Sequence, residues 1–294
     1  MELLGADSTL GWRLSVAVLG TLAIPLVIAI AYRLIGNKLF ALMAGFLLAI
    51  EGLAIVMSRT AILDGILMFL VLLGFYFVVR DLDHWRSRMN RLQSSALAIR
   101  PWLIPAAISL GLATGVKWSG LYFLAFFGLY TFVSDLVIRK RLGLPPLFAI
   151  GQGFVNAITL LVPALATYVL GWLGWILGSD GWGRQPERGW LAPLWEYHQN
   201  AFTFHTGVNS DHPYEANAFS WLVMGKPVAF YFERDESGET CDLLPECNEA
   251  ITAIPNLAIW YAGLIAIIWL LVRQFRKVRQ AELLILTGFL AGWL

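Results

Sequence analysis

Residues 61–79, AILDGILMFLVLLGFYFVV, form a nearly unbroken apolar run. As a helix, this stretch would be about 30 Å long, which is the thickness of the hydrocarbon core of a bilayer. The whole chain of 294 residues agrees, because it is 58% hydrophobic and only 14% charged, with a mean hydropathy of +0.67. Average soluble domains carry about 25% charged residues. We therefore predict an all-α polytopic membrane protein, and the net charge of +1 predicts no acidic or nucleic-acid partner.

Seven further stretches resemble this one, so we expect about eight transmembrane segments. The expected segments are Leu14–Tyr32, Leu39–Met57, Ala61–Val79, Trp102–Val116, Leu121–Ile138, Leu147–Leu177, Ile254–Val272 and Ala281 to the end. The fourth is short for a span, and the sixth is long and interrupted by Pro163. The chain then divides into transmembrane helices over 1–178, a large polar loop over 179–253 and further transmembrane helices over 254–294.

The distribution of basic residues predicts the orientation. Fourteen of the 21 Lys and Arg residues fall in alternate loops, mainly within 80–100, 139–141 and 273–279. Cytoplasmic loops carry this excess, so the loop 179–253 is expected on the extracytoplasmic face of a plasma membrane. Residues 1–12 would also lie outside, without a visible signal peptide. We therefore expect a fragment that is truncated at both ends.

Ionisable residues near the membrane mark function by default. Glu51, Arg59 and Asp64 suggest a charged cluster that opens outward, and Lys117 falls at the outer apex between two spans. The planar fork of donors on an arginine suits the phosphate of a lipid headgroup. The alternative is snorkelling to headgroups, which suits Lys117 better than the deeper Glu51.

The outer loop holds three of the four histidines, His198, His205 and His212, at intervals of seven residues. The segment from Pro193 to His205 can be helical, which would place the first two histidines on one face, two turns apart. That separation is too large for one metal ion, because paired ligands usually stand at i and i+4. We therefore expect polar packing or substrate contact rather than a metal site. GKPVAFYFE, residues 225–233, suggests a strand-like or interfacial stretch.

Cys241 and Cys247 are the only cysteines, and both lie in this loop. An oxidising compartment permits a disulfide, and the five-residue spacer can close a small loop. Two metal thiolates would need further ligands, and C-x5-C is not a finger spacing. We predict a disulfide.

Several short motifs, in order along nearly the whole chain, resemble the protein O-mannosyltransferases, especially the actinobacterial members. MSRTAILDGILMF (57–69) is similar to that family's SR-x-x-LLD block, and GLATGVKWSGLY (111–122) to its G-x-KW-x-GL block. YH, FH and HPY, followed by WLVMGKPVAFY, resemble its large outer loop, and TAIPNLAIWYAG (252–263) resembles its GNP-x-x-WW segment. The chain departs from the family pattern at Ala216, Ala218, Phe219, Pro255 and Leu257.

The resemblance implies a GT-C-type glycosyltransferase that moves mannose from polyprenyl-phosphate mannose to Ser or Thr hydroxyls of secreted proteins, with inversion. The acceptor would be met at the translocon, among membrane lipids. The chemistry needs a carboxylate base, positive groups for the phosphate and an apolar groove for the prenyl chain. No cofactor beyond this donor is implied, and a requirement for a divalent cation stays open. No nucleotide-binding motif such as GxGxxG occurs, which fits a lipid-linked donor.

The resemblance also implies roles for individual residues. Asp64 resembles the second carboxylate of the family, an orienting or cation-holding residue. The base lies in an Asp-Glu motif of the family's first outer loop, expected before Met1, so this chain alone is expected to be inactive. The candidates for contact with the donor phosphate or substrate are Arg59, Lys117, Arg184, His198, His205, His212, Tyr214 and Glu51.

Two rival interpretations remain. A transferase of the same fold class with a glycolipid or lipid A acceptor is the nearer one, and the HPY loop favours a protein acceptor instead. A transporter would place charges through the full depth of the membrane and often shows repeat symmetry. Here the charges gather toward one face, and no repeat is visible.

Overall fold

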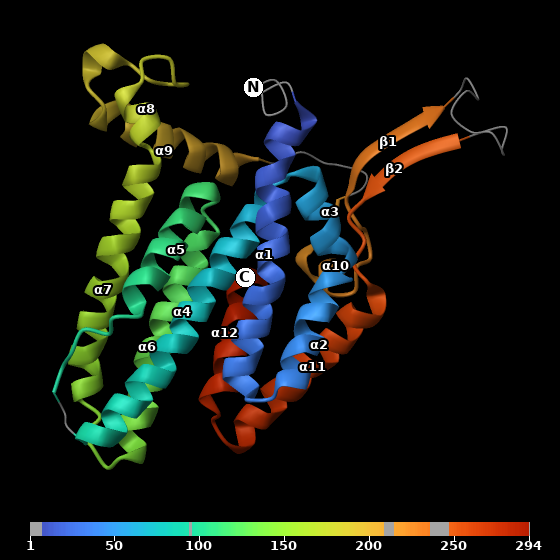
Figure 1. The fold of residues 1–294 in the computed structure, drawn as a ribbon. Helices are drawn as coiled ribbons and strands as arrows, with labels where there is room; N and C mark the ends of the chain where they lie inside the picture. The colour runs from blue at the N-terminus through green and yellow to red at the C-terminus, as the bar shows by residue number, and fades with distance from the viewer. Residues whose placement is uncertain (1–7, 94–95, 209–214, 236–246, 294) are drawn as a thin grey trace.

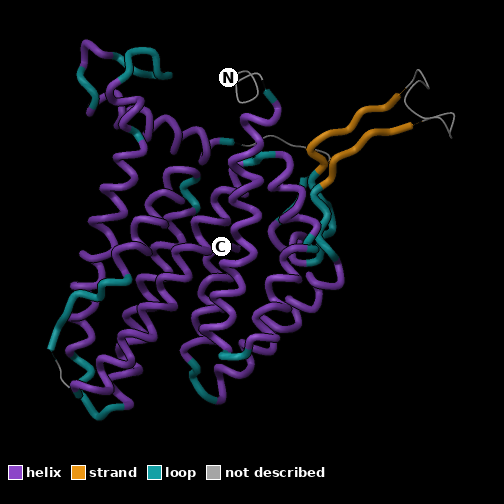
Figure 2. Tube along the Cα trace, in the orientation of Figure 1, coloured by secondary structure: helices purple, strands orange, loops and turns teal. Residues whose placement is uncertain are grey.

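The computed structural model describes residues 8–93, 96–208, 215–235 and 247–293. In these ranges the helices form one bundle, and a two-stranded hairpin projects from one end of it (Figures 1 and 2). The helices are α1 (Thr9–Ile35), α2 (Lys38–Ala49), α3 (Gly52–Thr60), α4 (Leu63–Leu92), α5 (Leu103–Val116), α6 (Gly120–Arg141), α7 (Phe148–Gly171), α8 (Leu173–Leu177), η2 (Pro186–Arg188), α9 (Leu191–Gly207), α10 (Ala218–Leu222), α11 (Leu257–Arg276) and α12 (Gln280–Trp293). The strands are β1 (Ala229–Asp235) and β2 (Cys247–Thr252).

The predicted membrane fold is confirmed. Within the described ranges, five helices are long and apolar enough to cross a bilayer, namely α1, α4, α6, α7 and α11. The bent pair α2 and α3 makes a sixth if it forms one span. Two of the eight expected segments are shorter helices of 14 residues each, α5 and α12. The expected break at Pro163 does not occur, because α7 continues through this proline to Gly171.

The short helix α5 lies against α4, α6 and α7 and supplies much of the core. Leu103, Leu110 and Ala113 are fully buried. Gly111 permits the closest approach, because a Cβ atom there would lie 2.5 Å from the carbonyl oxygen of Ala164 in α7. Ile104, Ile108 and Leu112 on the remaining face are 40–43% exposed, so α5 is a core element on one side and reaches the surface on the other.

The expected span Leu39–Met57 is divided into two helices that meet at 54°. Glu51 explains the break, because its carboxylate accepts a hydrogen bond from the Ala54 N–H at 2.8 Å and so caps α3. The same carboxylate accepts from the Asn256 N–H at 3.1 Å, which fastens the break to the start of α11. Gly52 lies against the carbonyl of Ile254 so closely that a Cβ atom would not fit. The Glu51 side chain therefore links the start of α3 to the start of α11.

We expect Glu51→Ala to reduce the free energy of unfolding by about 1–3 kcal/mol, because two backbone N–H groups would lose a charged acceptor. Glu51→Gln keeps an acceptor oxygen and should cost less. The measurement is thermal unfolding in detergent, with Glu249→Ala on the exposed hairpin as the control. Equal unfolding midpoints for Glu51→Ala and the control would contradict this stabilising role of Glu51.

The segment between α7 and α11 lies mostly at one end of the bundle, which we call the α9 end (Figure 1). The predicted helix from Pro193 to His205 is confirmed as part of α9, which runs across the ends of the bundle helices. The predicted strand-like stretch is also confirmed, because β1 pairs with β2 in antiparallel register. The predicted disulfide involves Cys241, which lies outside the described residues.

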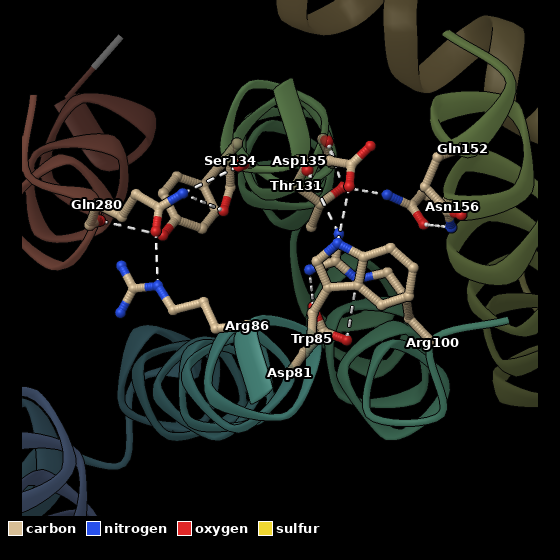
Figure 3. A network of polar contacts seen from close by, with 12 residues as sticks. Asp81, Trp85, Arg86, Arg100, Thr131, Ser134, Asp135, Gln152, Asn156 and Gln280 are labelled. Atoms are coloured by element: carbon tan, nitrogen blue, oxygen red, sulfur yellow. Dashed lines mark hydrogen bonds and ion pairs between the residues drawn. The ribbon is translucent and has the colours of Figure 1, made fainter. Parts of the chain in front are cut away.

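A buried polar network joins α4, α6, α7 and α12 (Figure 3). It lies in the halves of these helices that are away from the α9 end (Figure 1). Arg100 forms an ion pair with Asp81 on α4, and its Nη1 donates to the Thr131 carbonyl at 3.4 Å. Asp135 on α6 accepts from the Trp85 indole at 2.8 Å and from Arg139 Nε at 2.7 Å. The side chains of these four ionisable residues are no more than 1% exposed.

Amides complete this network. Gln152 on α7 bonds both the N–H and the carbonyl of Ala98, and it donates to Asn156, which in turn donates to Thr131. On the other side, Gln280 of α12 accepts from Arg86 at 2.6 Å and donates to Ser134 (Figure 3).

Two arginines of this network require a correction to the count of basic residues that predicts the orientation. Arg100 and Arg139 were counted among the basic residues of the cytoplasmic flank, but both are buried ion-pair partners. The remaining basic residues of that flank still outnumber those at the opposite ends.

Candidate functional site

The α9 end brings together Asp64 and Lys117, which are 53 residues apart in the chain. Asp64 lies in the first turn of α4, just after Ala61, whose φ of 57° ends α3 and reverses the chain. Lys117 follows the last residue of α5 in an extended conformation. The Lys117 Nζ lies 3.0 Å from the Asp64 Oδ1, and the two side chains are 55% and 38% exposed. The two side chains therefore form an ion pair and remain accessible to a ligand.

A cavity of about 240 Å³ surrounds this pair. Trp221, Met224 and Phe230 form its apolar walls, and Lys226 supplies a second ammonium group. The Lys226 Nζ donates to the Glu215 carbonyl at 2.6 Å. Met224 has a φ of 52°, a left-handed conformation that costs a residue other than glycine about 1–3 kcal/mol and is often found at functional sites. The lining thus carries two cations and one carboxylate.

Sequence reasoning did not single out Lys226. The available signal was its place in the WLVMGKPVAFY motif, at the position where the resembling family has Lys or Arg. The motif alone does not reveal that this lysine shares a cavity with Asp64, which is 162 positions earlier in the chain.

An aromatic chain, made of the side chains of Trp118, Tyr168 and His198, holds α9 against α7 and the end of α5. The Trp118 indole N–H donates to the Tyr168 hydroxyl at 3.3 Å, and that hydroxyl lies 2.6 Å from His198 Nε2. His198 Nδ1 lies 2.7 Å from the Leu194 carbonyl. A carbonyl only accepts, so Nδ1 donates to it, and in a neutral imidazole Nε2 then accepts from Tyr168. Trp118 also stacks on His198 and on His205, at 5.9 and 6.3 Å between ring centroids, which confirms that these histidines share a face.

A second cavity, of about 610 Å³, lies between this aromatic chain, the start of α6 and α9. Lys117 lines it as well as the first cavity. Its other polar walls come from Ser119, Tyr122, His205 and Thr206. The hydroxyl of Ser119 is buried, with no hydrogen-bond partner among the described residues. Aromatic rings and hydroxyl groups together suit a sugar or an extended peptide.

Two protein-family models match the sequence, and together they cover most of it. Residues 2–169 match the family model described as dolichyl-phosphate-mannose-protein mannosyltransferase. Residues 190–288 match the one described as the C-terminal four TMM region of protein-O-mannosyltransferase. The chain belongs to the protein O-mannosyltransferase family. The resemblance seen in the motifs is confirmed, and with it the GT-C-type membrane fold.

Curated relatives in this family carry consistent names. The polyprenol-phosphate-mannose–protein mannosyltransferases of Corynebacterium glutamicum and Mycolicibacterium smegmatis are each 30% identical over 97% of this chain and 60% of their own length. The Mycobacterium tuberculosis protein of that name is 28% identical over the same shares. The chain thus spans about three fifths of the curated relatives it matches. No solved structure matches.

The remaining candidate residues of this family member have separate surroundings. The expected cluster of Glu51, Arg59 and Asp64 does not form, because Glu51 bonds backbone N–H groups and Asp64 pairs with Lys117. Arg59 lines a different groove, of about 290 Å³, between α1, α2, α3 and α4. It has no ion pair or hydrogen bond within the described part of the chain. Sequence position placed these charges at one level but could not show which ones meet.

The Arg184 side chain binds backbone carbonyls of its own loop. Its guanidinium donates to the carbonyls of Gly189 at 2.5 Å and Ile176 at 3.3 Å, and it lies 5.4 Å from the Trp175 ring centroid. His212 and Tyr214 lie outside the described residues. Across the ranges that are described, no three His, Cys, Asp or Glu side chains gather as metal ligands.

Proposed function

We propose that this chain forms the donor-binding core of a protein mannosyltransferase. The complete enzyme would transfer mannose from polyprenyl-phosphate mannose to Ser or Thr hydroxyls of secreted proteins, with inversion. The names of the actinobacterial relatives support both the donor and the protein acceptor. The single structural observation that carries the proposal is the cavity at the α9 end, where Lys117 and Lys226 face the same space as Asp64.

The charges of this cavity suit the breaking of a sugar–phosphate bond. The acceptor oxygen would attack the anomeric carbon, and the bond from that carbon to the phosphate oxygen would break. The phosphate leaves with the electron pair, and fixed ammonium groups stabilise the charge that develops on it. Lys117 and Lys226 supply such groups, and Asp64 holds Lys117 in place through the 3.0 Å ion pair. Asp64 is thus a positioning residue in this proposal.

The proton of the acceptor hydroxyl needs a base. Asp64 contributes the only carboxylate to the described lining of the cavity, and it is committed to Lys117. We therefore assign the base to another carboxylate of the complete enzyme.

The face of the membrane is part of the proposal. The excess of basic residues at the opposite end of the bundle supports an extracytoplasmic α9 end in a plasma membrane. A membrane-impermeant thiol reagent on whole cells should then label Gln199→Cys on α9 and spare Lys140→Cys at the other end, with the parent protein as background. The reverse pattern would reject this orientation.

The decisive experiment uses the full-length protein in membranes with a radiolabelled polyprenyl-phosphate-mannose donor. Mannose should appear on a Ser/Thr-containing peptide, and no mannose should appear on the matched Ala peptide. Transfer to a glycolipid in place of the peptide, or no transfer to any acceptor, would reject the proposed function.

A further inference from the structure

Two arginines lie beside one tyrosine in the part of the bundle that is away from the α9 end. Arg33 lies in the last turn of α1, and Arg80 follows the apolar part of α4. Their guanidinium carbons lie 5.5 and 5.9 Å from the ring centroid of Tyr76. Arg80 Nη1 donates to the Tyr76 hydroxyl at 3.4 Å, and the Arg80 guanidinium lies 3.8 Å from the ring centroid of Trp102. We call these four residues the Arg80 cluster.

The Arg80 cluster lies near the boundary of the hydrocarbon core. Asp64 and Arg80 are 16 positions apart on α4, which corresponds to about 24 Å along the helix axis. Asp64 lies at the α9 end, so Arg80 is close to the opposite boundary of a core about 30 Å thick. Trp102, at the start of α5, suits the same depth, because tryptophan is enriched at the membrane–water interface. The phosphates of a lipid leaflet lie just beyond this boundary.

The cluster carries more positive than negative charge. Asp83 lies 3.6 Å from Arg33, and these two side chains are 33% and 46% exposed, so a ligand can reach them. Arg80 forms no ion pair within the described part of the chain, although an arginine at this depth is costly without an anionic partner. The two guanidinium groups also repel each other, and an anion bound to both would relieve this repulsion.

The phosphate of a lipid fits this arrangement. Arginine presents a planar fork of donors that matches phosphate oxygens, and basic sites between transmembrane helices bind anionic headgroups. Leu22 on α1 and Ile104 and Ile108 on α5 are 40–47% exposed, so the outer surfaces of these helices face acyl chains rather than a soluble partner. Snorkelling alone would leave the Arg80 guanidinium mobile, whereas here two aromatic rings hold it.

We propose that the Arg80 cluster binds the phosphate of an anionic phospholipid, phosphatidylglycerol, in the leaflet opposite the α9 end. The site is separate from the cavities around Lys117, which lie at the α9 end. The bound lipid joins the end of α1 to α4 and to the start of α5. Because Asp81 and Arg100 lie one and two positions from members of the cluster, the lipid also braces the segments that form this buried ion pair.

The first test is thermal unfolding of the purified full-length protein in detergent with added lipid. Phosphatidylglycerol should raise the unfolding midpoint by about 5–10 °C at a hundredfold excess over its Kd. Phosphatidylcholine, which has no net charge, should raise it much less, and inorganic phosphate should not replace the lipid. An equal shift with phosphatidylcholine would overturn the anionic site, and an equal shift with inorganic phosphate would overturn the assignment to a lipid.

Charge variants locate the site, with the Kd of phosphatidylglycerol measured by native mass spectrometry. Arg80→Gln should weaken binding about tenfold, the scale of one hydrogen bond to a charged group. Asp83→Asn removes the competing carboxylate and should strengthen binding, which a merely structural role of the cluster would not produce. Arg91→Gln, in the exposed last turn of α4, is the matched control and should leave the Kd unchanged.

Arg33→Gln tests the second cation. It should weaken binding less than Arg80→Gln does, because Asp83 already neutralises part of the Arg33 charge. The unfolding midpoint of each variant without lipid shows that the protein compared is folded. Equal weakening by Arg91→Gln and Arg80→Gln would indicate a general attraction between charges and overturn the site, as would an unchanged Kd in both Arg80→Gln and Arg33→Gln.

Discussion

Asp81→Ala should reduce the free energy of unfolding by about 3–5 kcal/mol, which is the usual cost of removing one partner from a buried ion pair. Asp81 and Arg100 are each 1% exposed. Without the carboxylate, the partners of the Arg100 guanidinium among the described residues would be the Thr131 carbonyl at 3.4 Å and the face of Trp85, 4.9 Å away. A buried cation with so few partners is costly. The measurement is thermal or denaturant unfolding of the purified protein in detergent.

The same helix offers a matched control. Asp83 forms an ion pair with Arg33 at 3.6 Å, and both side chains are partly exposed. Asp83→Ala should therefore cost no more than about 1 kcal/mol. The double variant Asp81→Leu/Arg100→Met removes both charges and should recover much of the lost stability. Equal losses for Asp81→Ala and Asp83→Ala would contradict the role of the buried pair.

Hydropathy was a good guide to the membrane helices, because any long helix in lipid must be apolar. It could not predict the division at Glu51. Glutamate is not among the preferred N-cap residues, and the second bond of this carboxylate comes from Asn256, 205 positions away. Arg100 and Arg139 show the same limit. A count of basic residues assumes that each one faces water, and only the fold reveals that these two face Asp81 and Asp135.

The candidate site was predictable in its level but not in its pairs. Alternation of the spans placed Asp64 and Lys117 at the same end of the bundle, and the structure joins them. The same reasoning grouped Arg59 with Asp64, yet the bend between α2 and α3 gives Arg59 a separate groove. Helical periodicity placed His198 and His205 on one face. Periodicity could not show that both ring nitrogens of His198 would bond other parts of the protein.

If the protein acts as proposed, Lys117→Ala should lower the kcat of mannose transfer roughly 100-fold, the scale of losing one preorganised group that stabilises developing charge. Lys117→Arg keeps the charge with a different geometry, and we expect it to retain more activity than the alanine variant. Lys140→Ala, at the exposed opposite end of the bundle, is the control and should leave kcat unchanged. The measurement is initial rates of mannose transfer at saturating donor. Wild-type kcat in Lys117→Ala would remove Lys117 from the site.

Asp64→Asn tests whether the carboxylate positions Lys117 or takes the acceptor proton. As a positioning residue, Asp64 keeps the Lys117 ammonium within 3.0 Å of a fixed point, and an amide oxygen can still accept that hydrogen bond. We therefore expect a loss smaller than that of Lys117→Ala, with an unchanged acidic limb in the dependence of kcat on pH. A general base would behave otherwise, because its removal abolishes the limb that reports its ionisation. Loss of that limb in Asp64→Asn, with a fall in kcat at least as large as in Lys117→Ala, would make Asp64 the base and overturn the assignment of that role to a carboxylate elsewhere in the enzyme.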